Sequence, residues 1–448
     1  MVRKIFIYKA IIVFLFLITP KTFAASIDDV INSNPSFAPA IISISVKDQN
    51  SGANIYQKNS KALVHPASTL KIITSSAALN YLGSDYNFKT GLYKNGNNIY
   101  LKVGADPLFT YGDMLSLASQ FKAKNPETIK NFVVDDTIID SEPFGIGWQW
   151  DDNADIHFPQ MSPYIVNRNL FMVKANISRK NAIVIEYSKE YKEPIINRVK
   201  YGENSNITTT RNVFSPDAPI IVSGTINEGK IIYIPAKNPK QLYCNVLLFS
   251  FLSNNIAINT NFKYEKLPRF SVQEAIISRS IEDVISAINK NSDNLSAEIL
   301  LKHAGAAKTE STGTTKDGLD VVKNFYEANG LKTDNIILVD ASGASMNDYV
   351  TADFMTDALR VIKKSQNFEM IRNSMTDPSN GTFKGRLPEL NGKIKVKTGT
   401  LANTSAVVGY IKTNSGRDLT FAIMLDNLPK NVNAKEFENK IIRAISQL

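Results

Sequence analysis

A serine and a lysine three positions apart, Ser68 and Lys71, stand at the start of an expected helix in the segment HPASTLKIITSSAALNYLG. Pro66 suits the first turn of a helix, and Gly83 supplies a stop. Apolar side chains recur at helical spacing and predict an amphipathic helix with one buried stripe: Leu70, Ile72, Ile73, Ala77, Leu79 and Leu82. Residues i and i+3 share a helix face, so the Lys71 amine can serve as base for the Ser68 hydroxyl. An ordinary capped helix would show the same pattern, so other motifs must decide.

Two further motifs follow this pair. The segment GKIKV alternates apolar and polar residues and predicts a strand, SAVVGYIKT predicts its hairpin partner, and between them stand Lys397, Thr398, Gly399 and Thr400. Gly399 is expected to leave room for a substrate backbone beside the strand. Earlier in the chain, SDNLSAEILLKHAG predicts a helix that opens with Ser292, Asp293 and Asn294. Three motifs in this order resemble the signature set of penicillin-recognising serine acyltransferases.

A second Ser-x-Asn sequence lies between the same two outer motifs. It consists of Ser345, Met346 and Asn347 in VDASGASMNDYVTA. We favour Ser292 because Ser-Asp-Asn is the fuller match and because it opens an expected helix, which would hold its side chains on a rigid element.

Around these motifs the resemblance narrows to one family. Successive segments are similar to landmarks of the low-molecular-mass class C penicillin-binding proteins, the D-alanyl-D-alanine carboxypeptidase/endopeptidase family of peptidases (S13): PASTLKIITSSAAL, VGADPLF, DDTIIDSEPFGIGWQWDD, SPYIVNRN, SDNLSAEILLKHAG, VDASGAS, NGTFKGRL and KTGTLANTSAVVGYI. The resemblance implies an α/β catalytic domain of the serine β-lactamase and penicillin-binding transpeptidase type, an antiparallel sheet flanked by helices. It also implies that this domain is discontinuous, with one or two mainly-β domains inserted after its first helix.

The texture of the chain agrees with a large insertion, because more than two hundred positions separate Ser68 from Ser292. Short Val-, Ile- and Tyr-rich runs such as NNIYLKVG, NAIVIEYS and GKIIYIPA are separated by Asn, Gly, Ser and Pro, which predicts mostly strands and hairpins. We therefore assign residues 86–274 to the inserted β-rich part. Residues 25–85 together with 275–448 form the predicted catalytic domain.

The first residues predict export. A basic start is followed by the apolar run IFIYKAIIVFLFLIT and by Thr22, Phe23 and Ala24, which fit a small-residue cleavage site. The run is short and contains Lys9, so a cleaved signal peptide at 1–24 is favoured over a membrane span. The expected location is the periplasm. Cys244 is the one cysteine and is interpreted as a buried, inert thiol, so stability must come from core packing.

Composition excludes several other classes of function. The formal charge of +9 falls to about +5 once residues 1–24 are removed, and the cations do not form a stripe interleaved with aromatic residues. We find no zinc-type spacing of Cys and His and no phosphate-binding Gly-rich loop, so we expect no nucleic-acid partner, no metal and no cofactor. The C-terminal segment AKEFENKIIRAISQL predicts an amphipathic helix that packs on the sheet. Membrane contact would be peripheral at most.

The residues also suggest a mechanism. A free lysine has a pKa near 10.4 and is a poor base at neutral pH. Lys397 beside Lys71 would supply a like charge which, together with burial, lowers the pKa of Lys71 so that it can deprotonate Ser68. Ser292 would then pass the proton to the leaving amine, and Asn294 would hold the substrate amide and the Lys71 side chain. The alternative for Lys397 is an ordinary surface lysine.

Substrate contacts follow from the same motifs. The backbone N–H groups of Ser68 and Thr400 would form the oxyanion hole, which typically contributes about 3 kcal/mol per donor. Lys397, Thr398 and Thr400 would bind the terminal carboxylate of D-alanine. By resemblance, Asp152 matches an acid that binds the far amine of diaminopimelate, although it also fits a simple turn residue.

The chain departs from the family pattern at one position. In this family the Ser-Gly-Leu-Ser segment is often followed by an arginine that helps to hold the diaminopimelate end of the stem peptide. Here the segment ends at Ser345, a further candidate for substrate binding, and the next residue is Met346. That substrate contact is therefore in doubt.

Three other functions remain as alternatives. A β-lactamase shares the motifs but needs rapid deacylation, and no Glu-x-x-Leu-Asn run lies between Ser68 and Ser292. A non-catalytic sensor of peptidoglycan or penicillin could use the same fold, although its motifs would not need to be intact. A simple esterase has no terminal carboxylate to bind and would not need the Lys-Thr-Gly strand. The sequence thus favours a carboxypeptidase/endopeptidase that acts on peptidoglycan peptides and is inhibited by β-lactams. The acyl-enzyme formed with penicillin is expected to be hydrolysed slowly.

Overall fold

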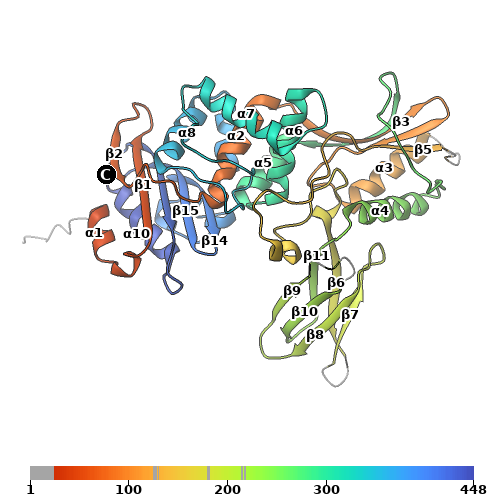
Figure 1. Ribbon diagram of the computed structural model, residues 1–448, viewed down its shortest axis with the longest axis horizontal. Coiled ribbons are helices and arrows are strands. Elements are labelled where there is room, and N and C mark those ends of the chain that lie inside the picture. Colours follow the sequence, from red (N-terminus) through yellow and green to blue (C-terminus); the bar gives the residue numbers. More distant parts are fainter. Residues whose placement is uncertain (1–24, 125–128, 130, 179–181, 213–214, 216–217) are drawn as a thin grey trace, which may run out of the picture.

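The computed structural model describes residues 25–448 except 125–128, 130, 179–181, 213–214 and 216–217. The predicted signal peptide, 1–24, lies outside the described residues. Figure 1 shows a larger body that contains both ends of the described chain, an elongated extension at its side and a smaller β-rich module below the extension.

An antiparallel five-stranded sheet forms the centre of the larger body, in the order β14-β15-β16-β1-β2. Its strands, in that order, are Ile394–Leu401, Thr404–Lys412, Asp418–Asp426, Ile41–Asp48 and Asn54–Lys58. The C-terminal helix α10 (Ala434–Ser446) packs on β15, and the short α1 (Ile27–Asn32) packs on α10. On the opposite face, α8 (Ala352–Lys364) contacts β1 and β16. Phe437, Ile441, Ile442 and Ile445 are buried, so the predicted packing of the last helix on the sheet is confirmed.

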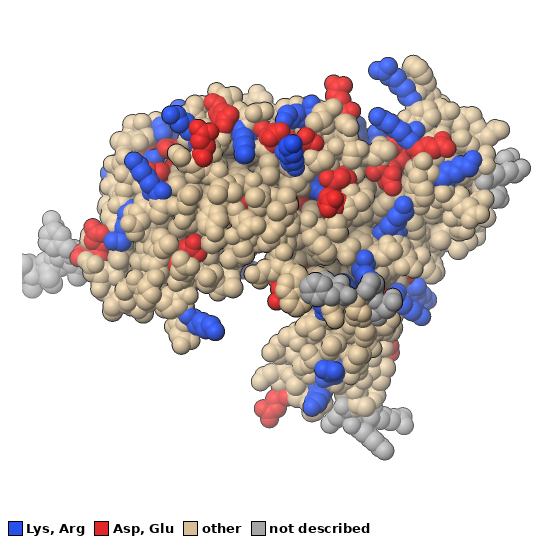
Figure 2. All heavy atoms as spheres, viewed as in Figure 1, with Lys and Arg blue, Asp and Glu red and all other residues tan. Residues whose placement is uncertain are grey.

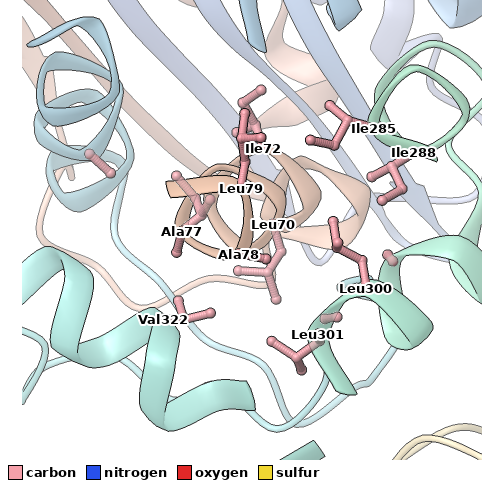
Figure 3. Packing of buried hydrophobic residues seen from close by; sticks show 14 of the residues in the cluster. Leu70, Ile72, Ala77, Ala78, Leu79, Ile285, Ile288, Leu300, Leu301 and Val322 are labelled. Carbon is pink, nitrogen blue, oxygen red and sulfur yellow. The ribbon is translucent and has the colours of Figure 1, made fainter. Parts of the chain in front are cut away.

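A group of helices covers the other side of this sheet: α2 (Leu70–Leu82), α5 (Ile281–Lys290), α6 (Asn294–Thr309), α7 (Thr315–Ala328) and α9 (Phe368–Ser374). Helix α2 lies at the centre of the group and contacts α5, α6, α7 and α8. Figure 3 shows Leu70, Ile72 and Leu79 of α2 pointing toward side chains of its neighbours, among them Ile285 and Leu300.

The predicted helix is present and ends at Gly83, but the prediction that it is amphipathic was wrong. Every residue from Leu70 to Leu79 is buried, including Lys71. The serines and threonines on the supposed polar face find partners inside the protein. Thr74, for example, donates to the carbonyl of Ala341, and Ser76 donates to the carbonyl of Ile72. A helix with neighbours on all sides has no face that must be polar, and small hydroxyl residues bury at little cost once they are bonded.

The segment between α2 and α5 forms three further sheets. The extension holds a five-stranded sheet in the order β12-β5-β4-β3-β13, with strands Lys263–Tyr264, Asn131–Asp135, Asn98–Lys102, Asn87–Asn95 and Val272–Ser280. The lower module holds two three-stranded sheets. One is β8-β10-β9, with strands Ile195–Tyr201, Ile220–Ile226 and Asn206–Thr210; the other is β11-β6-β7, with strands Lys230–Pro235, Leu170–Ile177 and Ile183–Tyr187. The chain leaves along β3 and returns along its antiparallel neighbour β13.

Two helices in this segment were not expected from the sequence. They are α3 (Tyr111–Lys124) and α4 (Pro239–Ser253), which pack on each other beside the sheet of the extension. Helix α4 contains the apolar run LYCNVLLFSFL, in which buried side chains such as Leu242, Val246 and Phe251 contribute to the second hydrophobic core. The exact domain boundaries of 86–274 remain a prediction.

The described residues include no helix of the length and apolar character needed to cross a membrane. Figure 2 shows basic and acidic side chains interspersed over the visible face of the larger body. The view shows no large area of a single charge sign, which agrees with the lack of a basic stripe in the sequence.

Candidate active site

Ser68 lies in a short 3-10 turn, Ala67–Thr69, directly before α2. Ala67 has a positive φ of 46°, a conformation that non-glycine residues rarely adopt and that often marks functional sites. The turn is held by Thr69, whose hydroxyl donates to the carbonyl of Pro66. The expected helix from Pro66 therefore begins later, at Leu70, and Ser68 sits on a strained turn at its entrance.

Glycines let two other segments approach this turn. A Cβ on Gly399 would lie 2.9 Å from the backbone nitrogen of Ser68, and one on Gly343 would lie 1.9 Å from the carbonyl oxygen of Ala67. We had expected Gly399 to leave room for a substrate backbone. In the structure, that room is taken by the Ser68 turn, so Gly399 brings β14 against Ser68.

Lys71 connects the three parts of the site. Its Nζ lies 2.8 Å from the Ser68 Oγ, 2.7 Å from the Asn294 Oδ1 and 2.8 Å from the carbonyl oxygen of Ser342. Asn294 in turn donates through Nδ2 to the carbonyl of His157 at 2.9 Å. The amide of Asn294 is thus occupied by Lys71 and by the segment that enters from the inserted part.

Lys397 lies on β14 and reaches Ser292. Its Nζ donates to the Ser292 Oγ at 2.9 Å and to the carbonyl of Thr398 at 2.8 Å. The expectation that Ser292 opens the helix was wrong. Helix α6 begins at Asn294 with Asp293 as N-cap, and Ser292 lies before it with a positive φ of 60°. The left-handed turn is what aims the Ser292 hydroxyl at Lys397.

Burial increases the fraction of Lys71 that is neutral near pH 7. Both lysine side chains are fully buried. Loss of hydration lowers the pKa of Lys71 to about 8, against the opposing effect of nearby acids, of which Asp340 is the strongest. Burial, followed by the charge of Lys71, holds the pKa of Lys397 well below its usual range. We had expected burial and the charge of Lys397 together to lower the pKa of Lys71; burial lowers it, whereas the like-charge effect falls on Lys397.

A buried loop backs the site. The Asp340 carboxylate accepts hydrogen bonds from the backbone N–H groups of Gly343, Ala344 and Ser345, from the Ser342 hydroxyl and from the Trp148 indole. Glu298 on α6 accepts from the N–H groups of Ala341 and Ser342. These bonds orient the Ser342 carbonyl toward Lys71.

A cavity of about 310 Å³ opens above Ser68. The predicted residues that line it are Ser68, Ser292, Asn294, Thr398, Gly399 and Thr400. Lys71 and Lys397 lie beneath it. The sequence analysis did not single out several other lining residues: His157, Phe158, Asn291, Ala344, Thr382, Arg386, Leu401, Ser405, Ala406, Lys435 and Glu438. The landmark NGTFKGRL contains Thr382 and Arg386 and was the one signal that could have identified them.

Two candidates do not line this cavity. Ser345 is buried, and its Oγ accepts from the backbone N–H of Asn347. Asp152 lies in the 3-10 turn Trp150–Ala154 and is half-buried, and its pKa is raised by burial and by Asp151 and Asp155. The segment that follows Asp152 does reach the cavity, through His157 and Phe158.

The histidines do not form a catalytic triad with Ser68 in the described part of the chain. The ring Nδ1 of His65 lies 2.8 Å from Asp426, and its Nε2 lies 3.1 Å from the carbonyl of Met346. His303 contacts Tyr86, and burial lowers its pKa to about 4. No group of three or more metal-binding side chains occurs among the described residues.

Comparisons with known proteins place the chain in a family. The model of the family described as "D-Ala-D-Ala carboxypeptidase 3 (S13) family" matches residues 23–448. A D-alanyl-D-alanine carboxypeptidase from Actinomadura sp. (strain R39) is 24% identical over 440 residues, which cover 88% of this chain and 79% of the relative. The D-alanyl-D-alanine carboxypeptidase DacB of Haemophilus influenzae is 21% identical over 89% of this chain and 87% of its own.

Solved structures show the same fold. The crystal structure of penicillin binding protein 4 (dacB) from Haemophilus influenzae superimposes with a TM-score of 0.81 at 19% identity, covering 94% of this chain and 99% of the other. A predatory endopeptidase from Bdellovibrio bacteriovorus, in complex with an immunity protein, has a TM-score of 0.53 at 14% identity and covers 91% of this chain and 92% of its own. The expected catalytic fold, with its inserted β-rich part, is therefore confirmed. The chain belongs to the D-Ala-D-Ala carboxypeptidase 3 (S13) family.

Proposed function

We propose that this protein is an exported serine D-alanyl-D-alanine carboxypeptidase with endopeptidase activity on peptidoglycan stem peptides and cross-bridges. The observation that carries the proposal is the 2.8 Å contact between the Ser68 Oγ and the Lys71 Nζ, an amine whose pKa burial lowers to about 8. Ser68 lines a cavity that the two other motifs also line, and Lys71 is buried beneath it. This arrangement is typical of a nucleophile with its own base.

In the acylation step, neutral Lys71 accepts the Ser68 proton while the Ser68 Oγ attacks the carbonyl of the penultimate D-alanine. The oxyanion that forms is bound by the backbone N–H groups of Ser68 and Thr400. The proton is then delivered through Ser292 to the amine of the leaving group, and the C–N bond breaks. The hydrogen bond from Lys397 to the Ser292 Oγ supports this route, because it orients the hydroxyl without supplying a base of its own.

Deacylation completes the cycle. A water molecule attacks the carbonyl of the acyl-serine ester as its proton passes to Lys71, and Lys71 then gives that proton to the Ser68 Oγ as the ester bond breaks and the shortened peptide leaves as an acid. Attack of the Ser68 Oγ on the carbonyl of a β-lactam opens the ring and likewise leaves an acyl-enzyme. The two substrates of the proposal differ only in the leaving group: free D-alanine for the carboxypeptidase, and the amine of a second stem peptide for the endopeptidase.

The test is mass spectrometry of the purified mature protein after incubation with benzylpenicillin, with Ser68→Ala as the control. We expect one penicilloyl adduct on Ser68 that decays over many minutes, and release of D-alanine from a D-Ala-D-Ala peptide. Rapid loss of the adduct would support the β-lactamase alternative. Absence of any adduct would refute the catalytic proposal and leave a non-catalytic sensor.

The proposed export has its own test. Expression of the full chain in a diderm bacterium, followed by fractionation and N-terminal sequencing, should yield a periplasmic protein that begins at Ala25. Retention of the residues before Ala25 in a membrane fraction would contradict it.

A further inference from the structure

One wall of the cavity lies outside the three motifs. It is formed by Thr382 and Arg386, from the segment before β14, and by Lys435 and Glu438 of α10. Thr382 contacts the catalytic strand directly, since its Oγ1 lies 2.6 Å from the Oγ1 of Thr398. This wall therefore adjoins the threonines that are expected to receive the terminal carboxylate of the substrate.

The guanidinium of Arg386 is held rigidly in this wall. Its Nε donates to the Asn439 Oδ1 at 2.9 Å, and its Nη2 donates to the carbonyl of Lys435 at 3.1 Å and to the Glu438 Oε2 at 2.8 Å. The group also lies over the ring of Phe383, 4.5 Å from its centroid. Three of the five N–H donors are thus used. Nη1, with the two remaining donors, makes no hydrogen bond to any described residue.

The partner of Arg386 is tied to the catalytic strand. Glu438 is buried, and its Oε1 accepts from the Ser405 Oγ at 2.6 Å. Ser405 on β15 pairs with Thr400 on β14. Arg386 is therefore connected to Thr400 through Glu438 and Ser405. The loop that carries Arg386 also carries Thr382, whose hydroxyl contacts that of Thr398. A preorganised guanidinium of this kind loses little entropy when it binds a carboxylate.

A cation would stabilise the terminal carboxylate of the proposed substrate in this cavity, and Lys397 does not supply one. The Nζ of Lys397 is already bonded to Ser292 and to the Thr398 carbonyl, and Lys397 is fully buried beneath the cavity. Burial also favours its neutral form, because its pKa is held well below the usual value. Of the described lysines and arginines, those that line the cavity are Arg386 and Lys435. Lys435 is exposed, whereas the Arg386 side chain is 13% exposed and fixed in place.

We infer that Arg386 is a substrate-binding residue whose Nη1 receives the terminal carboxylate of the D-Ala-D-Ala peptide, beside the hydroxyls of Thr398 and Thr400. The inference rests on the proposed function and specifies how that site selects a free C-terminal carboxylate. The carboxylate on the fused ring of a penicillin would take the same position.

The test compares two peptides that differ only at the C-terminus: diacetyl-L-Lys-D-Ala-D-Ala and its C-terminal amide. For the wild type we expect a strong preference for the free acid in kcat/KM. Arg386→Gln should lower kcat/KM for the acid by about ten- to hundredfold, mainly through KM, because a hydrogen bond to a charged group is lost. Its kcat/KM for the amide should stay within about twofold of the wild type.

Matched variants separate binding from structure. Lys384→Gln removes the same charge from the same loop at an exposed residue that does not line the cavity, and it should keep the wild-type preference. Glu438→Gln loosens the tie to α10 but leaves the guanidinium, so it should retain a preference for the acid. Equal losses for acid and amide in both Arg386→Gln and Glu438→Gln would show a purely structural role. Loss of the preference in Lys435→Gln alone would assign the carboxylate to Lys435. Either result would overturn the inference.

A binding measurement makes the inference independent of turnover. In a Ser68→Ala background, the dissociation constants of the acid and the amide can be determined by calorimetry, with and without Arg386→Gln. A weaker affinity for the acid alone supports the role of Arg386 even if the wild type releases no D-alanine, in which case only the proposed function fails. If Arg386→Gln leaves both affinities of the Ser68→Ala protein unchanged while the wild type releases D-alanine, the role of Arg386 is refuted and the proposed function stays intact.

Discussion

The proposed acid–base role of Lys71 leads to a quantitative prediction for the pH dependence of β-lactam acylation. An unperturbed lysine, with a pKa near 10.4, would be neutral in about 0.04% of molecules at pH 7. With the pKa that burial lowers to about 8, about 10% of the Lys71 amines are neutral at that pH. Burial therefore increases the population of the active base by about two orders of magnitude, equivalent to about 3 kcal/mol.

The sign of the effect follows from which form reacts. The neutral amine is the base, so the second-order rate constant for acylation should rise about tenfold per pH unit below pH 7 and level off above about pH 8. The assay is stopped-flow acylation by a fluorescent penicillin between pH 5.5 and about 9.5. Thermal denaturation over the same range would control for unfolding.

Two variants complete this test. Lys71→Arg keeps a positive charge but cannot lose its proton, so the plateau should disappear and acylation should fall by at least about a thousandfold. Ser68→Ala should give no signal at any pH. A wild-type rate that is flat or falls between pH 6 and 8 would refute the argument that neutral Lys71 is the base.

Three further predictions concern stability. Gly343→Ala should destabilise the fold by about 3 kcal/mol and impair acylation, because a Cβ would lie 1.9 Å from the Ala67 carbonyl oxygen; an unchanged midpoint in urea would contradict this. Asp140→Ala strands the buried Lys302 without its ion-pair partner and should cost about 3 to 5 kcal/mol, whereas adding Lys302→Met should recover most of it in calorimetry. Burial and the carboxylate of Asp340 raise the pKa of Asp348 to about 10, so above about pH 4 this side chain ionises in the unfolded state but not in the folded one, and its contribution to stability falls as the pH rises. Asp348→Asn should therefore raise the melting temperature relative to the wild type more at pH 8 than at pH 5. A gain in melting temperature that does not grow with pH would contradict this.

The hairpin of β14 and β15 and the last helix could be predicted because their patterns match their surroundings. At the start of β14 the apolar Ile394 and Val396 alternate with lysines, as on a strand with one face against the core, and in α10 the apolar side chains form one stripe. For helix α2 the same reasoning from apolar periodicity predicted the wrong burial. Its period indicates an outward face, but neighbouring helices from distant parts of the chain cover every side of it. Periodicity reports burial by one neighbour and fails where several converge.

The sequence by itself determined the family and indicated the proposed nucleophile and its lysine partner, because short motifs in a fixed order require no knowledge of distant contacts. It did not determine how the two lysines divide their roles, since a pKa depends on burial and on charges that only folding brings together. The wall formed by Arg386 and Glu438 also depended on the tertiary structure. These two residues are 52 positions apart, and they meet because α10 packs on the sheet that carries Thr398 and Thr400.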